Sequence, residues 1–232
     1  MLVVHAPATR TAMPRRIVII QGHPDPDPKR LLRALAGAYA DGAQQAGHAV
    51  TCIDLATLDF PMLRNADEFE HEPIPDTLKP AQAAILAAEH IVLVFPLWLG
   101  TMPALVKAFL EQVMRPGIAF SYQANGLPLK KLRGRSARLV VAMGMPVLAY
   151  RWWFLAHGLK GLERSILGFV GIKPIRESFF RGRRRGERGN APEMARADAG
   201  VGCKGGMKKS ARKRAHHTSL PTSRESGMLV PE

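Results

Sequence analysis

The run Ile91-Val-Leu-Val94 constrains the fold of this chain more than any other segment. An uninterrupted apolar run is typical of a parallel strand that is buried on both faces. Pro96 ends this strand, and Pro103 stands where a helix can begin without losing a needed N–H donor. The segment between the two prolines therefore predicts a tight loop at the carboxyl end of a central strand. Open α/β sheets bind their ligands at such a place.

Four further apolar runs alternate with segments of helical spacing along the chain. Strands and helices that alternate in this way need right-handed crossovers and a parallel sheet covered on both faces. We therefore expect an α/β fold, a flavodoxin-like three-layer sandwich with a five-stranded parallel sheet of order 2-1-3-4-5. The expected strands are 16–21, 48–55, 91–94, 136–142 and 175–180, and the expected helices are 29–46, 79–89, 103–114 and 159–169.

Three unusual loops fall at the switch point of this sheet order, at 22–30, 96–103 and 143–150. The second loop combines a large aromatic side chain, Trp98, with Gly100 and the hydroxyl of Thr101. Apolar bulk beside exposed backbone amides suits a flat heteroaromatic ring with polar edges, such as a flavin. The alternative for Trp98 is a side chain packed into the core at the end of a buried strand.

The first loop reads Gly22-His-Pro-Asp-Pro-Asp-Pro-Lys-Arg30. It precedes a helix, whose N-terminus favours an anion, and Lys29 and Arg30 add positive charge suited to a phosphate. Asp25 and Asp27 oppose an anion there, so a rigid helix-capping turn is the alternative. The glycine signatures of dinucleotide-binding and P-loop proteins are absent from this loop.

The third loop and the residues after it carry the candidate catalytic groups. Gly144 permits close approach of the backbone to a ligand. Tyr150 and His157 are candidates for binding a reduced carbonyl or balancing charge during hydride transfer. The aromatic run from Tyr150 to Phe154 is alternatively a dimer contact, since exposed clusters of this kind mark interfaces.

The composition places further bounds on the chain. No apolar stretch approaches the roughly 20 residues of a membrane span. Residues 1–13 lack a secretory-signal pattern, and we expect them to form a disordered leader. Cys52 and Cys203 lie far apart without metal-ligand spacing, so we expect no metal site and a reducing, cytoplasmic location. Cys52 lies in a strand pattern and is expected to be a small core residue.

The net charge of +14 is concentrated toward the carboxyl end, because residues 181–232 hold 13 Lys/Arg and 5 Asp/Glu. This basic tail lacks apolar periodicity and is expected to be disordered. Contact with nucleic acid or an acidic surface through the tail is a minor alternative. The abrupt change near Arg181 also suggests the hypothesis that the reading frame changes there.

Residues 14–180 resemble the NAD(P)H:quinone oxidoreductase family, which includes modulator-of-drug-activity proteins and potassium-efflux ancillary oxidoreductases. The resemblance rests on Gly22-His-Pro24, Phe95-Pro-Leu-Trp98 with Met102-Pro-Ala104 and Lys107, Pro116-Gly-Ile-Ala-Phe-Ser-Tyr122, Met143-Gly144 and the run 161–172. It implies a homodimeric flavoenzyme that holds FAD or FMN non-covalently. Such an enzyme takes hydride from NAD(P)H and passes it to a quinone in a two-electron, ping-pong cycle through flavin N5.

The resemblance also implies roles for individual residues. Tyr150 falls on the active-site tyrosine of the family, and His157 lies near its histidine after one inserted residue. A flavodoxin-like regulatory or ancillary protein with little turnover is the alternative function. The implied flavin-binding residues are His23, Lys29 and Arg30 at the phosphate, and Pro96, Leu97, Trp98, Leu99, Ala142, Met143, Gly144 and Met145 against the isoalloxazine ring.

Overall fold

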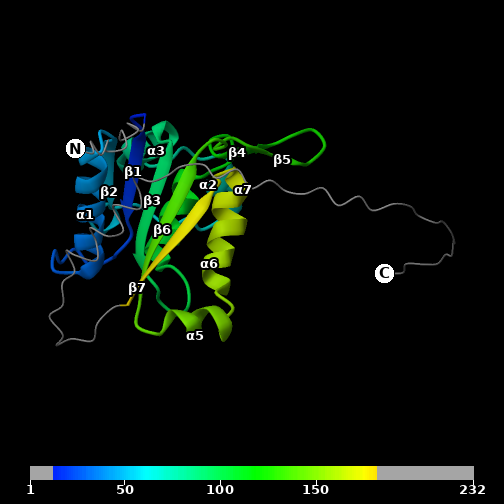
Figure 1. Cartoon of the computed structure of the whole chain (residues 1–232). Coiled ribbons are helices and arrows are strands. Elements are labelled where there is room, and N and C mark those ends of the chain that lie inside the picture. The colour runs from blue at the N-terminus through cyan, green and yellow to red at the C-terminus, as the bar shows by residue number, and fades with distance from the viewer. Residues whose placement is uncertain (1–12, 182–232) are drawn as a thin grey trace, which may run out of the picture.

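Five parallel strands form the central sheet of the protein in a computed structural model that describes residues 13–181 (Figure 1). Their order is β2-β1-β3-β6-β7, which confirms the flavodoxin-like order predicted from the sequence. The expected leader and basic tail lie outside the described residues, apart from the positions at their inner ends. The strands are β1 (Arg16–Gln21), β2 (Ala49–Asp54), β3 (His90–Pro96), β6 (Ser136–Met143) and β7 (Ile175–Arg181).

Helices connect the strands and cover both faces of the sheet (Figure 1). The main helices lie within a few residues of their predicted positions, and the stretch from α6 through η3 to α7 is one continuous helix with a π-helical middle turn. The helices are α1 (Leu31–Gln45), α2 (Ala66–Glu70), α3 (Lys79–Ala87), α4 (Ala104–Val113), α5 (Val147–Trp152), α6 (His157–Gly161), η3 (Leu162–Leu167) and α7 (Gly168–Val170), with short 3₁₀ turns η1 (Leu55–Thr57) and η2 (Asp76–Leu78).

The apolar side chains of each central strand divide between two cores. On one face, Ile19 and Val94 pack in a cluster that includes Leu32 and Leu35 of α1. On the other face, the alternate positions of the same strands join a larger cluster with α3, α4 and α6. Because successive side chains of a strand point to opposite faces, an uninterrupted apolar run such as that in β3 is needed where both faces are covered.

The short helices α2 and α5, the turns η1 and η2, and two short strands were not predicted from the sequence. Strands β4 (Phe120–Tyr122) and β5 (Pro128–Lys130) pair antiparallel in a hairpin separate from the main sheet. Three-residue strands are too short to show a period, and the pattern of the chain there is dominated by the turn between them. The expected loop 143–150 is also shorter than predicted, because its last four residues begin α5.

Cys52 is exposed, so its assignment as a core residue was wrong. β2 lies at the edge of the sheet, and of its six residues Ile53 is the buried one. An edge strand has a neighbour on one side only, and its outer residues receive less cover than those of β3. Within residues 13–181, no helix combines the length and the apolar character needed to cross a lipid bilayer.

Candidate active site

The three predicted loops begin side by side at the carboxyl edge of the sheet. Gln21 of β1 is in register with Val94 of β3, and Pro96 of β3 is in register with Ala142 of β6. Two backbone hydrogen bonds continue this pairing into the loops, from Gly22 N–H to the Val94 carbonyl (2.7 Å) and from Leu97 N–H to the Ala142 carbonyl (2.8 Å). We call this edge, with its three loops, the rim.

The loop after β3 makes a tight turn between Trp98 and Thr101. The two residues exchange backbone hydrogen bonds of 2.9 and 3.0 Å, and the central residues Leu99 and Gly100 have φ of 47° and 80°. Two left-handed residues in the middle of a two-residue turn are characteristic of a type I′ turn. Glycine adopts this conformation readily, whereas leucine does so at a cost. The turn holds the whole Leu99 side chain out in solvent.

Tyr150 supports this turn from the side. Its side chain is 1% exposed, and its hydroxyl donates a 2.9 Å hydrogen bond to the carbonyl of Gly100. Burial raises the pKa of the Tyr150 phenol, so the group stays protonated and remains a donor at neutral pH.

Gly158 packs against the same turn. A Cβ atom built on Gly158 lies 2.2 Å from the Gly100 carbonyl oxygen and 2.8 Å from Cβ of Thr101. Contacts this short are not compatible with a side chain, so glycine at this position lets α6 touch the turn directly.

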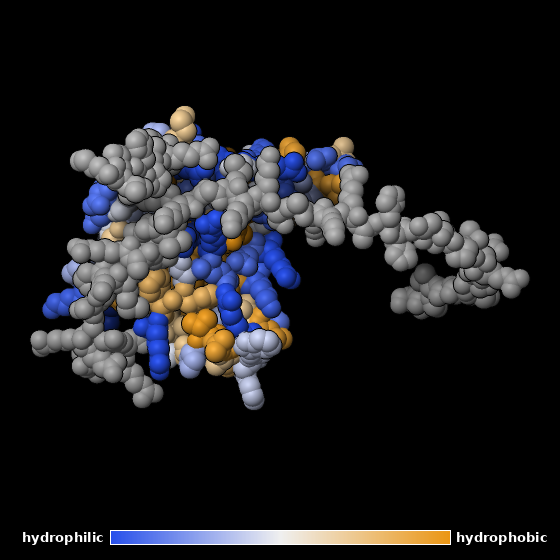
Figure 2. Space-filling view, in the orientation of Figure 1, coloured by the Kyte–Doolittle hydropathy of each residue, from blue (hydrophilic) through white to orange (hydrophobic). Residues whose placement is uncertain are grey.

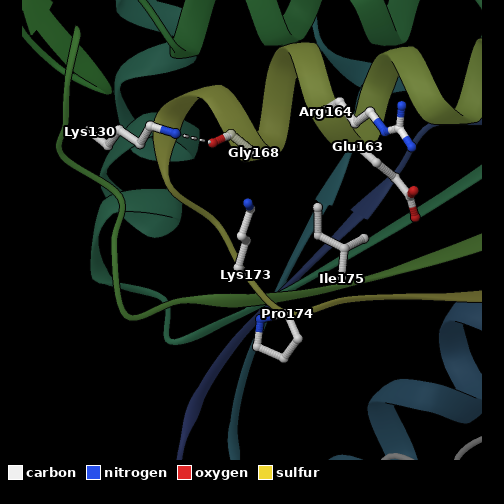
Figure 3. A pocket seen from close by; sticks show the side chains of 7 residues that line it. All are labelled: Lys130, Glu163, Arg164, Gly168, Lys173, Pro174 and Ile175. Carbon is white, nitrogen blue, oxygen red and sulfur yellow. Dashed lines mark hydrogen bonds between the residues drawn. The ribbon is translucent and has the colours of Figure 1, made fainter. Parts of the chain in front are cut away.

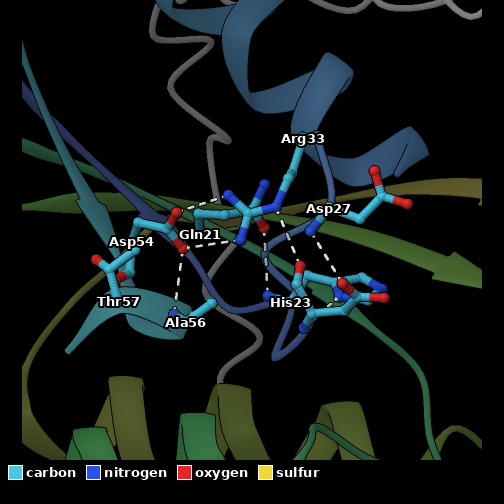
Figure 4. A network of polar contacts seen from close by, with 8 residues as sticks. Gln21, His23, Asp27, Arg33, Asp54, Ala56 and Thr57 are labelled. Atoms are coloured by element: carbon cyan, nitrogen blue, oxygen red, sulfur yellow. Dashed lines mark hydrogen bonds and ion pairs between the residues drawn. The ribbon is translucent and has the colours of Figure 1, made fainter. Parts of the chain in front are cut away.

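The loop after β1 folds on itself through its own side chains. The backbone N–H of Asp25 donates to Nδ1 of His23 (3.0 Å), that of Asp27 to Oδ1 of Asp25 (2.9 Å), and that of Lys29 to Oδ1 of Asp27 (2.9 Å). Figure 4 shows His23 and Asp27 in this network. Burial, followed by the charge of Arg30, lowers the pKa of His23. Because its Nδ1 accepts a hydrogen bond, the neutral ring carries its proton on Nε2.

Two arginines at the start of α1 pair with carboxylates. Arg30 bonds Oδ2 of Asp25 through Nε at 2.8 Å and through a closer Nη2 contact. Arg33 forms a two-pronged pair with Asp54, with N···O distances of 2.6 and 3.1 Å (Figure 4). Sequence reasoning did not select Arg33, although its position three residues after Arg30 places the two on one side of the helix.

Gln21 is a second residue of the rim that sequence reasoning missed. It is buried, and its Oε1 accepts from the N–H of His23 at 3.3 Å. Its Nε2 has no hydrogen-bond partner among the described residues. A polar residue at the end of an otherwise apolar strand, directly before a glycine, was the available signal.

The rim joins the first loop to the second through aromatic rings. The His23 and Trp98 ring centroids lie 6.2 Å apart, with the rings nearly perpendicular. Trp98 is 48% exposed, so packing in the core is not its role here. Among the ring-side residues expected from the sequence, Pro96 and Met143 are buried, Leu97, Ala142 and Met145 are partly buried, and Trp98, Leu99 and Gly144 are exposed.

The two candidate catalytic residues lie in different surroundings. Tyr150 is buried with its hydroxyl on the Gly100 carbonyl, whereas His157 is exposed at the first residue of α6. Between them, Leu155 and Ala156 both have left-handed φ, of 52° and 51°. The chain therefore turns sharply there, and this turn brings α6 back against the second loop.

Large apolar side chains are exposed beside the rim. Trp152 is 79% exposed and Trp153 is 85% exposed, and Leu148, Phe154 and Leu155 also face solvent. Figure 2 shows apolar surface gathered at the lower end of the molecule, where Figure 1 places α5. Exposed apolar groups in such number are typical of surfaces that contact another molecule.

A cavity of about 610 Å³ lies at the opposite, amino-terminal end of the strands (Figure 3). Lys130, in the wall of this cavity, donates a 3.1 Å hydrogen bond from Nζ to the carbonyl of Gly168. Cations commonly satisfy the last carbonyls of a helix in this way. Because the cavity lies at the amino-terminal end of the strands, it is distinct from the rim at their carboxyl end. Its lining residues are Lys130, Glu163, Arg164, Gly168, Lys173, Pro174 and Ile175.

The fold and the rim together define an α/β protein of the flavodoxin-like class, with its candidate site at the switch point of the sheet. The family model described as having a flavodoxin-like fold matches residues 15–200. The chain therefore belongs to this family, and the family resemblance predicted from the sequence is confirmed.

Named relatives and a solved structure are consistent with this assignment. The chain is 26% identical over 167 residues to an uncharacterized NAD(P)H oxidoreductase of Haemophilus influenzae, covering 70% of this chain and 82% of the relative. It is 33% identical over 155 residues to an FMN-dependent NADH:quinone oxidoreductase of Erythrobacter litoralis, covering 62% and 76%. The fold matches an NAD(P)H:quinone oxidoreductase from Methanothermobacter marburgensis with a TM-score of 0.67 at 20% identity, over 83% and 98% of the two chains.

Proposed function

We propose that this protein binds FMN at the rim and uses NAD(P)H to reduce quinones or related electrophiles. The main support is the meeting of three loops at the carboxyl edge of the sheet, in a chain whose relatives include proteins named FMN-dependent NADH:quinone oxidoreductases. FMN, when bound, supplies the hydride chemistry, since a flavin accepts two electrons from NAD(P)H and passes them on. Of the two flavins that the sequence leaves open, the names of the relatives favour FMN.

The residues at the first loop fit the phosphate end of FMN. α1 has fifteen residues, no side-chain cap at its N-terminus and no acidic residue in its first turn. Its first N–H groups and its dipole therefore favour an anion. Lys29 and Arg30 bring positive charge to the same end, and His23 is the second residue of the loop. We propose that these three residues hold the phosphate.

The residues at the second and third loops fit the ring. The N–H groups of Leu97, Trp98 and Thr101 are already bonded within the protein. Edge hydrogen bonds from this loop therefore fall to Leu99 and Gly100, whose N–H groups have no partner within residues 13–181. The exposed face of Trp98 supplies apolar contact. We propose that Pro96 to Leu99 and Ala142 to Met145 enclose the ring.

Tyr150 and His157 have different parts in this proposal. The Tyr150 hydroxyl is held on the Gly100 carbonyl, so its part is to keep the turn in the shape that meets the ring. His157 is exposed at the start of α6, which itself packs on the turn. We propose that it supplies a proton or balances charge on the acceptor as the acceptor is reduced.

The exposed aromatic residues support the further proposal that the protein is a homodimer. Trp152, Trp153 and Phe154 stand in solvent next to the rim, and aromatic residues are enriched in the cores of interfaces. Light scattering after gel filtration measures the mass in solution. We expect a dimer for the full chain and a monomer for Trp152→Ser/Trp153→Ser, and a wild-type monomer would contradict this proposal.

The test of the proposed activity is direct. The full chain is saturated with FMN, desalted and examined for bound flavin, and NADH and NADPH oxidation is then followed with menadione as acceptor. Trp98→Ala is expected to weaken FMN binding by about fivefold, because an aromatic ring contact contributes about 1 kcal/mol beyond its area. Met62→Ala, an exposed apolar residue in another part of the chain, is the matched control. Protein that retains no flavin would contradict the proposal, and bound FMN without NAD(P)H oxidation would favour the ancillary role.

A further inference from the structure

The carboxylate of Asp25 lies in the first loop, at the end of the rim that is best suited to bind an anion. Oδ1 of Asp25 accepts from the N–H of Asp27 at 2.9 Å, and Oδ2 accepts from the guanidinium of Arg30. The Asp25 carbonyl also accepts from Nε of Arg33 at 3.1 Å. A single residue thus binds the loop backbone and both arginines at the start of α1.

The positive charge at this end is consequently largely neutralised inside the protein. Arg30 is paired with Asp25, and Arg33 is paired with both carboxylate oxygens of Asp54. Lys29 has no carboxylate partner among the residues that the structure describes. The hydrogen bond from Asp27 N–H, followed by that from Arg30, holds the pKa of the Asp25 carboxyl below its usual range. Asp25 is therefore ionised at neutral pH.

A phosphate that approaches this helix end meets the Asp25 charge directly. To bind Arg30 it has to displace the carboxylate or share the guanidinium with it, and two like charges at one cation repel each other. A flavin without a phosphate meets no such competition, because its ring lies at the other loops of the rim. Asp25 therefore opposes binding of the phosphate and does not affect binding of the ring.

We propose that Asp25 is a specificity-determining residue, whose carboxylate competes with the phosphate of FMN for Arg30 and so sets how strongly the protein prefers FMN to riboflavin. The inference rests on the proposed function, since it concerns the same site. It predicts that loss of the Asp25 charge makes the rim more selective for phosphorylated flavins, while the affinity for the flavin ring stays unchanged.

Asp25→Asn is the sharpest test, because asparagine keeps an oxygen that accepts from the N–H of Asp27 and removes both the charge and the Oδ2 acceptor of Arg30. Dissociation constants for FMN and for riboflavin are measured by quenching of flavin fluorescence in dilute buffer. We expect FMN to bind about fivefold more tightly to the variant, the size of effect that an exposed charge pair has, and riboflavin to bind as before. The gain for FMN should shrink in ~1 M salt, where the screening length is about 3 Å.

Two further sets of variants make the test specific. Asp76→Asn is the matched control, since Asp76 is also an aspartate paired with a cation, Lys79, in another part of the chain. Arg30→Gln should weaken FMN binding less in the wild-type background than in the Asp25→Asn background, because in the wild type Asp25 competes with the phosphate for the guanidinium. If Asp25→Asn folds poorly by circular dichroism, Asp25→Ser replaces it, since its hydroxyl can also accept from Asp27.

The outcomes separate this inference from the proposed function. An unchanged ratio of FMN to riboflavin affinity overturns the role of Asp25 while leaving flavin binding intact. Weaker FMN binding by Asp25→Asn also overturns it, and shows instead that Asp25 orients Arg30 toward the phosphate. Failure of both flavins to bind wild type and variants alike overturns the proposed function together with the inference.

Discussion

The hydroxyl of Tyr150 donates a 2.9 Å hydrogen bond to the carbonyl of Gly100, across fifty positions of sequence. Gly100 is a central residue of the turn after β3, and Tyr150 belongs to α5 after β6. The bond therefore joins the second loop of the rim to the helix that follows the third. With Gly158 packed against the same carbonyl, it gives the turn two supports from a later part of the chain.

Tyr150→Phe tests the first support. It removes one hydrogen bond at a buried site and keeps the ring, so we expect a loss of about 1 kcal/mol in the free energy of unfolding. Urea denaturation measures this loss. FMN affinity should fall as well, because the turn loses its anchor. Tyr122→Phe is the control, since Tyr122 is 66% exposed, and an equal effect of the two changes would contradict the role given to Tyr150.

Gly158→Ala tests the second support. The new methyl group would overlap the Gly100 carbonyl, and we expect a loss of about 1–3 kcal/mol as the turn and α6 move apart. Gly161→Ala is a matched control within the same helix, because a Cβ atom there meets nothing within 4 Å. Alanine suits a helix interior better than glycine by about 1 kcal/mol, so Gly161→Ala should raise stability. Thermal unfolding followed by circular dichroism measures the midpoint temperature of each variant. If Gly158→Ala and Gly161→Ala shift this temperature in the same direction, the packing of Gly158 on the turn is contradicted.

Leu99→Asn should stabilise the protein. Leu99 is fully exposed at φ of 47°, so replacing it removes no packing and relieves a left-handed conformation that asparagine tolerates better. We expect a gain of about 1 kcal/mol in denaturant unfolding. Leu148→Asn, an exposed leucine within α5, should bring no gain. A loss of stability in Leu99→Asn would show that the leucine side chain makes a contact in solution.

His90 should make the stability depend on pH between about 4 and 6.5. Burial, followed by the charge of Arg138, lowers its pKa from 6.5 to about 4, and its ring bonds Ser136 Oγ at 2.8 Å. In this window the unfolded chain binds the proton and the folded protein does not, so stability rises with pH. Above pH 6.5 His90 is neutral in both states and does not reduce the free energy of unfolding. As the pH falls to about 4, the free energy of unfolding decreases, because only the unfolded chain takes up the proton.

The size of this effect follows from the shift. The difference between pH 7 and pH 4 should be about 3 kcal/mol, at about 1.4 kcal/mol for each pH unit of the window. Urea denaturation across this range measures it, and His90→Asn should flatten the profile. The lowered pKa values of Asp25 and Asp76 affect stability below pH 3.8, outside the window. Within the window, the lowered pKa of His23 adds a slope of the same sign as that of His90, and the raised pKa of the Glu163 carboxyl adds one of opposite sign, so the profile of His90→Asn should be flatter but not level. A profile that stays equally steep in His90→Asn would contradict the assignment.

Much of the fold was predictable because its signals are local. The apolar run of β3 and its two flanking prolines indicated a buried strand followed by a loop, and the alternation of strands and helices led to the observed order of the sheet. The three loops were placed correctly at one edge, since parallel strands end together. The hairpin of β4 and β5 and the exposure of Cys52 were not predictable in this way, because they depend on which elements lie next to each other.

Local patterns along the chain are enough to indicate the five strands of the main sheet, the four main helices and where the loops of the rim begin, because chain direction and hydrophobic period are local properties. The tertiary structure alone decided what the side chains of the rim do. It turned the Tyr150 hydroxyl onto Gly100, left about half of Trp98 exposed and placed the Asp25 carboxylate on Arg30. Each of these depends on distances between atoms brought together by folding. A residue type can therefore indicate the chemistry that is available, but packing determines whether its polar group is free for a ligand or already bonded within the protein.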